Sequence, residues 1–332
     1  MRVLVTGGAG FIGSHLSEAL LERGDEVWAL DDLSTGRLGN LRTFERHPRF
    51  RFLEGTVLDG STVHGLVAQC DRVFHLAAAV GVKYVLENPL RSLITNIRGT
   101  EVVLEACAQH QRRVLLFSSS EVYGKGVAVP FAEGDDRVMG PTHKLRWSYA
   151  CGKAVDEGMA QAYWQQQQLP VTVVRCFNTC GPRQTSAYGM VIPSMVLRAL
   201  RNEPILVYGD GKQSRCFSAV SDVVRGTLQL VDSKDTVGEI FNIGTDEEIT
   251  VVQLAERIRR ACHSASAIEF VPYEQIYGRS FEDMRRRVPD LAKIRRFVGY
   301  RPEVGLDQLL ESIICDTCEQ MGRPAPVGLP TA

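Results

Sequence analysis

The chain carries little net charge and no long hydrophobic run. Its 332 residues include 38 lysines and arginines against 39 aspartates and glutamates, a formal net charge of −1. This balance excludes a global positive field that would attract nucleic acid or a membrane surface, although a local anion site stays open. No apolar stretch approaches the roughly 20 residues that span a bilayer. Residues 1–13 also lack the basic start and cleavage site of a secretion signal, so we expect a cytoplasmic protein.

Cysteine lacks the paired pattern of a disulfide framework. There are nine cysteines, an odd number, and most of them stand alone in the sequence. Cys315 and Cys318 form a C-x-x-C pair, but no second pair and no histidine pair follows at zinc spacing. We therefore predict reduced thiols and no metal site.

The first half of the chain alternates short β-branched runs with amphipathic helical stretches. The expected strands are residues 3–6, 27–30, 72–76, 113–117 and 171–175. This rhythm predicts an α/β fold of the Rossmann type, in which helices cover both faces of a doubly wound parallel sheet.

Beyond residue 175 the rhythm gives way to turns rich in glycine and proline, then to a strand at 239–244 and a helix over 250–262. We predict an NAD-binding Rossmann domain and a smaller C-terminal lobe that binds the substrate. The Rossmann domain is expected to span 1–175 and to be rejoined by 217–243, and the lobe to comprise 176–216 and 244–332.

A glycine-rich segment, Thr6-Gly7-Gly8-Ala9-Gly10-Phe11-Ile12-Gly13, lies between the first strand and an apolar helix. Glycine there allows a tight turn and a close approach of the backbone to a pyrophosphate, which the helix N-terminus stabilises. The second strand ends at Asp31, whose carboxylate is placed to bind ribose hydroxyls and to repel a 2'-phosphate. The segment therefore predicts NAD as the cofactor, in preference to NADP.

Tyr149 and Lys153 are four residues apart, so a helix places both side chains on one face. A lysine ammonium and a positively charged nicotinamide both favour the phenolate, so we expect the pKa of Tyr149 to be lowered. Tyr149 then becomes a candidate general base.

Together with the glycine segment and the Ser118-Ser119-Ser120 strand end, this pair resembles the extended short-chain dehydrogenases/reductases that modify nucleotide sugars. The resemblance covers nearly the whole chain. It implies that Ser119 assists Tyr149 and that Asn96 is a structural residue on a helix that borders the cofactor. The positions assigned to NAD are Gly7, Gly10, Phe11, Ile12, Gly13, Asp31, Thr56, Val57, Leu76, Ala77, Ala78, Asn96, Tyr149 and Lys153.

The resemblance also implies a nucleotide-sugar substrate, most simply a UDP-sugar. The matching motifs in the second half are Phe177-Asn178 with Gly181-Pro182-Arg183, Gln213-Ser214-Arg215, and Arg287-Val288-Pro289-Asp290. Arginine suits a sugar diphosphate because its planar guanidinium binds phosphate oxygens two at a time. The positions assigned to the substrate are Asn178, Arg183, Val191, Val207, Tyr208, Arg215, Arg287 and Asp290.

Enzymes of this group begin by oxidising C4 of the sugar, and Glu121 indicates the fate of the resulting ketone. Galactose-type epimerases usually lack a carboxylate at this position, and dehydratases usually precede it with Asp where this chain has Ser120. The stretches 140–153 and 277–290 are also similar to UDP-glucuronate decarboxylases. The expected catalytic residues are Ser119, Ser120, Glu121, Tyr149, Lys153 and Arg287.

Two alternatives to a decarboxylase stay open. UDP-glucuronate 4-epimerases must also bind a carboxylate, and the loop 185–193 looks more like theirs. A catalytically silent NAD-binding sensor is the other possibility, although Ser119, Tyr149 and Lys153 are all present. In addition, helices expected at 89–110 and 147–168 carry apolar stripes, and the resemblance implies that they pair with their copies in a homodimer.

Overall fold

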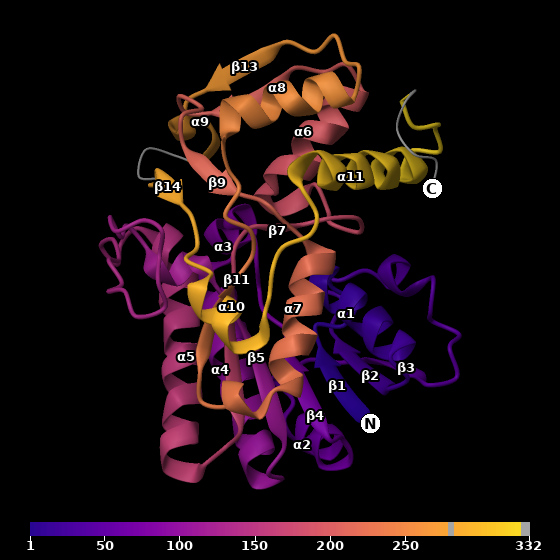
Figure 1. Cartoon of the computed structure of the whole chain (residues 1–332), viewed down its shortest axis with the longest axis vertical. Helices are drawn as coiled ribbons and strands as arrows, with labels where there is room; N and C mark the ends of the chain where they lie inside the picture. Colours follow the sequence, from indigo (N-terminus) through magenta and orange to yellow (C-terminus); the bar gives the residue numbers. More distant parts are fainter. Residues whose placement is uncertain (278–281, 327–332) are drawn as a thin grey trace.

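Seven strands form one parallel sheet in the computed structural model, which describes residues 1–277 and 282–326 (Figure 1). The strand order is β11-β6-β5-β4-β1-β2-β3. The strands are β1 (Arg2–Thr6), β2 (Glu26–Asp31), β3 (Phe50–Glu54), β4 (Arg72–His75), β5 (Arg113–Ser119), β6 (Val171–Cys176) and β11 (Ile240–Ile243). The order reverses between β1 and β4, which is where a Rossmann sheet opens its ligand crevice. The predicted fold class is confirmed.

Strand β3 is the part of this sheet that sequence reasoning missed. Arg51 and Glu54 interrupt its apolar residues, and none of its residues is fully buried. An edge strand needs no continuous hydrophobic run because one side of it meets solvent. The usual signal for a buried parallel strand is therefore absent here.

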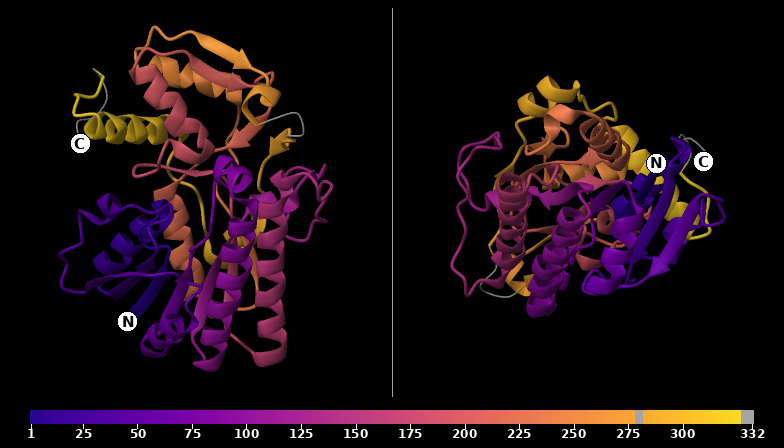
Figure 2. Two further views of the ribbon diagram at one scale, coloured as in Figure 1. Left: turned by 180° about the vertical axis from the view of Figure 1, so that it is seen from behind. Right: turned by 90° about the horizontal axis from the view of Figure 1, so that it is seen from below.

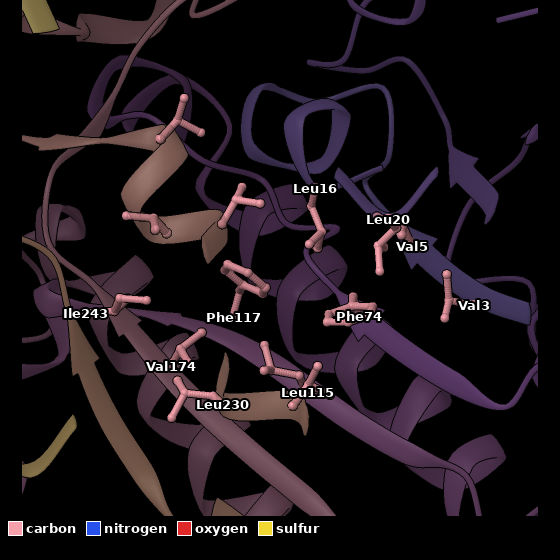
Figure 3. Packing of buried hydrophobic residues seen from close by; sticks show 14 of the residues in the cluster. Val3, Val5, Leu16, Leu20, Phe74, Leu115, Phe117, Val174, Leu230 and Ile243 are labelled. Carbon is pink, nitrogen blue, oxygen red and sulfur yellow. The ribbon is translucent and has the colours of Figure 1, made fainter. Parts of the chain in front are cut away.

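Helices cover both faces of the sheet. One face packs against α1 (Phe11–Glu22), α7 (Val220–Asp232) and α10 (Ala292–Val298), and the other against α2 (Gly60–Gln69), α4 (Pro89–Gln109) and α5 (Ser148–Gln167). Val3 and Val5 point to the first face, whereas Leu4 between them points to the second. Figure 3 shows the first of these cores, with Phe74 and Phe117 packed beneath Leu16.

A second lobe lies above the carboxyl ends of the sheet strands (Figure 1). Its helices α6 (Val191–Leu200), α8 (Val251–Ala261) and α11 (Leu306–Gln320) share a separate hydrophobic core. Thr250 caps α8 through a capping box with Gln253, which explains why that helix starts where predicted. None of the described helices has the length and apolar composition that crossing a bilayer requires.

The smaller elements connect these layers. The strands are β7 (Thr179–Cys180), β8 (Ile205–Tyr208), β9 (Ser214–Cys216), β10 (Ser218–Ala219), β12 (Glu248–Thr250), β13 (Ile268–Val271) and β14 (Arg286–Arg287). The short helices are η1 (Leu38–Leu41), α3 (Val82–Glu87), η2 (Ser120–Tyr123), η3 (Leu145–Trp147), η4 (Ala187–Gly189), η5 (Lys234–Thr236) and α9 (Tyr273–Tyr277).

The chain crosses between the two lobes more often than predicted. Strand β11 pairs with β6, and α7 packs on α1, so this part of the chain lies with the Rossmann sheet. Leu291, Ile294 and Tyr300 also belong to the core beneath the sheet. The structure therefore departs from the predicted lobe of 244–332, because the segment around α10 packs on β11 and α7.

A buried ion pair joins α5 to the sheet directly behind the strand ends. Arg175 on β6 donates to both oxygens of Glu157 on α5, with Nε–Oε1 at 2.9 Å and Nη2–Oε2 at 2.7 Å. Glu157 also accepts from the Ser118 hydroxyl on β5, and Arg175 Nη1 donates to the Tyr123 hydroxyl at 2.9 Å. These bonds fix the position of α5 relative to β5 and β6.

Replacing Glu157 with alanine should therefore destabilise the fold, because the buried Arg175 loses its counter-ion. We expect a loss of about 3–5 kcal/mol in the free energy of unfolding, measured by urea denaturation. The exposed pair Arg295–Asp246 provides the control, since Asp246→Ala should cost less than about 1 kcal/mol. Similar small losses in both variants would contradict this role for Glu157.

Candidate active site

A cavity of about 500 Å³ lies between the two lobes. The Rossmann side contributes the loops that follow β1, β2 and β4, the end of β5 and the first turns of α5. The other lobe contributes residues 189–195 and parts of β8, β9 and β14. All six residues expected to be catalytic line this one cavity: Ser119, Ser120, Glu121, Tyr149, Lys153 and Arg287.

The glycine loop leaves room only for backbone. Gly7 has φ +72°, and a Cβ added there would lie 2.8 Å from the Ala77 nitrogen. A Cβ on Gly13 would lie 2.1 Å from the Gly7 carbonyl oxygen. Helix α1 begins directly after this turn without a side-chain cap, so its first amides are available to an anion. The loop thus fits the pyrophosphate of a dinucleotide.

Asp31 lies at the end of β2 and is 7% exposed. Its Oδ1 accepts from the Leu33 amide at 2.8 Å and its Oδ2 from the Ala9 amide at 2.9 Å. Burial raises the pKa of Asp31, and these two hydrogen bonds oppose that shift. The amides orient the carboxylate, and its remaining lone pairs suit ribose hydroxyls.

The other positions assigned to the cofactor fall into two groups. Those of the first group line the cavity: Phe11, Ile12, Thr56, Val57, Leu76, Ala77 and Ala78. Asn96 differs, because it is 1% exposed and is absent from the lining. Its side-chain amide accepts from the Ala79 nitrogen at 2.7 Å and donates to the Ala79 oxygen at 3.3 Å. Asn96 therefore supports the loop after β4 from behind.

Tyr149 and Lys153 lie on the first turns of α5, as their spacing predicts. The expected lowering of the Tyr149 pKa includes the charge of the nicotinamide, and the chain alone shows the opposite direction. Burial raises this pKa, the charges of Glu121 and Asp156 raise it further, and a hydrogen bond with Ser119 lowers it only in part. The ammonium of Lys153 pairs with Asp156, Nζ to Oδ2, at 3.1 Å.

Glu121 is held between two arginines. Its Oε1 accepts from Arg287 Nη1 on β14, and its Oε2 lies 2.8 Å from Arg146 Nη1 on η3. Both guanidinium groups favour the anion, so the pKa of Glu121 stays well below its usual range although burial acts in the opposite direction. The two arginines therefore favour the ionised form of Glu121.

The cluster extends from Glu121 into the second lobe. Arg287 Nη2 donates to Asn178 Oδ1, and Asp283 accepts from Arg215 Nη2 at 2.8 Å and lies 3.5 Å from Arg146 Nη2. The cluster of Glu121, Arg146, Asp283, Arg215 and Arg287 holds three guanidinium groups and two carboxylates, an excess of one positive charge. An anionic substrate group is therefore favoured at this end of the cavity.

Sequence reasoning missed Arg146 and Asp283, although both line the cavity. Arg146 lies in the stretch 140–153 that resembles the decarboxylases, and that was its one available signal. Asp283 lies within 277–290, of which residues 278–281 are outside the described part of the chain.

The substrate positions also divide. The cavity is lined by five of the eight: Asn178, Val191, Tyr208, Arg215 and Arg287. The other three lie outside it.

Arg183, Val207 and Asp290 lie elsewhere for local reasons. Arg183 has φ +66°, and its guanidinium pairs with Glu18 on α1. Val207 is fully buried in the core of the second lobe. Asp290 accepts from the Ala292 amide at 2.7 Å, at the start of α10. These three side chains are therefore occupied in holding the fold.

The sequence matches a family model described as GDP-mannose 4,6 dehydratase over residues 4–313. A UDP-N-acetyl-alpha-D-glucosaminuronate decarboxylase of Bacillus cytotoxicus is 43% identical over 314 residues, which cover 94% of this chain and 96% of that protein. UDP-glucuronic acid decarboxylase 1 of Danio rerio is 36% identical, covering 94% of this chain and 72% of its own length.

Solved structures show the same architecture. The UDP-glucuronic acid 4-epimerase of Bacillus cereus, in complex with UDP-glucuronic acid and NAD, aligns with a TM-score of 0.87 at 27% identity. The alignment covers 97% of this chain and 100% of that chain.

Asp31→Ala should weaken NAD binding about tenfold, because ribose hydroxyls lose a buried anionic acceptor. The same change should narrow the preference for NAD over NADP, since the 2'-phosphate no longer meets a carboxylate. Calorimetric titration with both dinucleotides measures both effects. Asp32→Ala is the matched control, and its effect should be smaller because Asp32 is an exposed residue of the following loop. Equal effects of the two changes would count against Asp31 as the ribose ligand.

Proposed function

This chain belongs to the GDP-mannose 4,6-dehydratase family, and within that family we propose that it is an NAD-dependent decarboxylase of a UDP-hexuronate. The reaction oxidises C4 of the sugar and releases the C6 carboxyl group as carbon dioxide. With UDP-glucuronate, the product is a UDP-4-keto-pentose or, once the ketone has been reduced, UDP-xylose. The observation that carries the proposal is the Glu121–Arg287 ion pair, which lines the same cavity as Tyr149.

NAD+ bound by the glycine loop and Asp31 supplies the hydride acceptor for C4. Tyr149 accepts the proton of the 4-hydroxyl group. In the chain alone burial raises the pKa of this phenol, so the phenolate needs positive charge close to it. Lys153 and the nicotinamide provide that charge, and Ser119 adds a hydrogen bond.

Oxidation at C4 places the carboxyl group β to a ketone, and loss of carbon dioxide from such an acid is intrinsically easy. The site then has to orient the carboxyl group, stabilise the enolate and allow C5 to be protonated. Arg146 and Arg287 offset the repulsion between Glu121 and the substrate carboxylate. Arg287 lines the cavity, so its guanidinium group is placed to stabilise the enolate.

Two substrates are compatible with this assignment. UDP-glucuronate is the first, because decarboxylases of that sugar at 35–36% identity cover nearly the whole chain. UDP-N-acetylglucosaminuronate is the second, because the relative at 43% identity is named for it. The two sugars differ only at C2, so the chemistry at C4 and C5 is the same.

The epimerase and the silent sensor are weaker alternatives. The UDP-glucuronate 4-epimerase of Bacillus cereus is 27% identical, below the 36% and 43% of the decarboxylases. A silent protein would be expected to have lost part of the catalytic set, yet Ser119, Tyr149 and Lys153 line one cavity.

The decisive variants separate hydride transfer from carbon dioxide release. Glu121→Gln and Arg287→Ala should lower carbon dioxide release about a hundredfold, because the carboxyl group and the enolate lose their electrostatic support. NADH formation should fall much less, so NADH absorbance should exceed the pentose found by NMR. Tyr149→Phe is the control, since losing the base should slow both steps about a hundredfold. Equal losses in both steps for Glu121→Gln and Arg287→Ala would overturn the assigned roles.

We also propose that the enzyme is a cytoplasmic homodimer. No disulfide joins the cysteines of the described residues, which agrees with a reducing compartment. Helices α4 and α5 pack side by side on one outer face of the molecule (Figure 2, left). Leu90, Ile94 and Val155 on these helices are 70%, 44% and 46% exposed. A second copy of the same face would cover these side chains.

Light scattering at micromolar concentration should give the mass of a dimer. Val155→Arg should convert the dimer to a monomer, because a guanidinium group would have to be desolvated at the interface. Val127→Arg is the matched control, since Val127 is 95% exposed on a loop and belongs to neither α4 nor α5. A monomeric wild-type protein would refute the dimer.

A further inference from the structure

Asp156 is a buried carboxylate to which the proposed mechanism gives no role. It lies one turn beyond Lys153 on α5 and is 0% exposed. The distance from Lys153 Nζ to Asp156 Oδ2 is 3.1 Å, and the lysine side chain is only 3% exposed. A buried charge needs a partner, so each of these two groups makes burial of the other tolerable.

A row of polar groups continues from Asp156 to the cofactor loops. The Thr100 hydroxyl on α4 favours the charged form of Asp156 and lies 3.1 Å from His75 Nε2 on β4. His75 Nδ1 lies 2.7 Å from the Thr6 hydroxyl at the end of β1, and Thr6 in turn accepts from the Ala77 amide. Burial lowers the pKa of His75 to about 3, so this chain of groups is uncharged between Thr100 and Thr6.

Other titratable groups around the pair come from each neighbouring element. Tyr149 and Glu157 lie on α5, Glu121 on η2, His75 on β4 and Cys176 on β6. Glu157 is bound by Arg175, and Glu121 is bound by Arg146 and Arg287. From α4 the facing group is the neutral hydroxyl of Thr100.

We propose that Asp156 is a positioning residue whose carboxylate holds the Lys153 ammonium toward α4 and thereby limits how strongly that ammonium stabilises the Tyr149 phenolate. The inference rests on the proposed function in assigning the base to Tyr149. Asp156 then sets the pH at which the base becomes available.

The charges determine the direction of the effect. A carboxylate near a phenol opposes its ionisation, and the charge of Asp156 is one of the causes that raise the Tyr149 pKa. Asparagine keeps the shape of the side chain and removes the charge. Asp156→Asn should therefore lower the Tyr149 pKa and leave the ammonium free to turn toward the phenolate.

The test is a tyrosinate absorbance titration of the NAD-bound enzyme, with the Tyr149→Phe protein subtracted to isolate this one phenol. In Asp156→Asn the midpoint should fall by about one pH unit. Thr100→Val should lower the midpoint by a smaller amount, because Asp156 loses a hydroxyl group that favours its charged form. Glu22→Gln is the control for net charge, since Glu22 is exposed on α1, and its midpoint should match the wild type.

An unchanged or raised midpoint in Asp156→Asn would overturn the proposal, as would an unchanged midpoint in Thr100→Val if Asp156→Asn does not fold. The titration needs no substrate, so its outcome is independent of the reaction catalysed. Product analysis of the wild-type enzyme tests the decarboxylase assignment separately. Where turnover is measurable, the rate of NADH formation can also be followed as a function of pH. The acid limb of that profile should shift by the same amount as the midpoint of the Tyr149 titration.

Discussion

The structure of the active site depends on the ion pairs that Glu121 forms with two arginines. Burial acts to raise the pKa of this carboxyl group, and the guanidinium groups of Arg146 and Arg287 lower it. These three residues come from η2, η3 and β14, which lie far apart in the sequence. Their pairing connects the end of β5, the entry into α5 and the second lobe. A desolvated charge needs oppositely charged partners, and Glu121 takes its two partners from both lobes. These ion pairs make one end of the cavity polar.

The same principle recurs along α5. Its first turns carry Tyr149 and Lys153, and the Lys153 ammonium is matched by Asp156. Its next turn carries Glu157, matched by Arg175 on β6. In each pair both charged groups are shielded from water, and each compensates the charge of the other. The helix is thus fixed by charge as well as by apolar packing, which is consistent with the role that we propose for Tyr149.

Much of this arrangement could be predicted from sequence because its signals are local. The glycine segment, Asp31 and the Tyr149–Lys153 spacing each describe one strand end or one helix face. Arg146 and Asp156 were missed because a charged residue within a helical stretch is usually solvated, and only tertiary packing buries these two. Val207 and Tyr208 were both assigned to the substrate, but alternation along β8 sends Val207 into the core and leaves Tyr208 in the cavity. Arg183 pairs with Glu18 on α1 instead of lining the cavity, and its motif gives no local signal of that ion pair.

A decarboxylase and an epimerase differ in the fate of one carbon atom, C6 of the sugar. An enzyme built around Glu121 and Arg287 should break the C5–C6 bond after oxidation at C4, whereas an epimerase would retain that bond. The most direct measurement is ¹³C NMR of the wild-type enzyme with NAD+ and UDP-glucuronate labelled at C6, run in parallel with the labelled 2-acetamido sugar. We predict that the label of at least one of these sugars appears as bicarbonate while an unlabelled pentose accumulates. Label retained in UDP-galacturonate, with no bicarbonate formed from either sugar, would contradict the decarboxylase assignment.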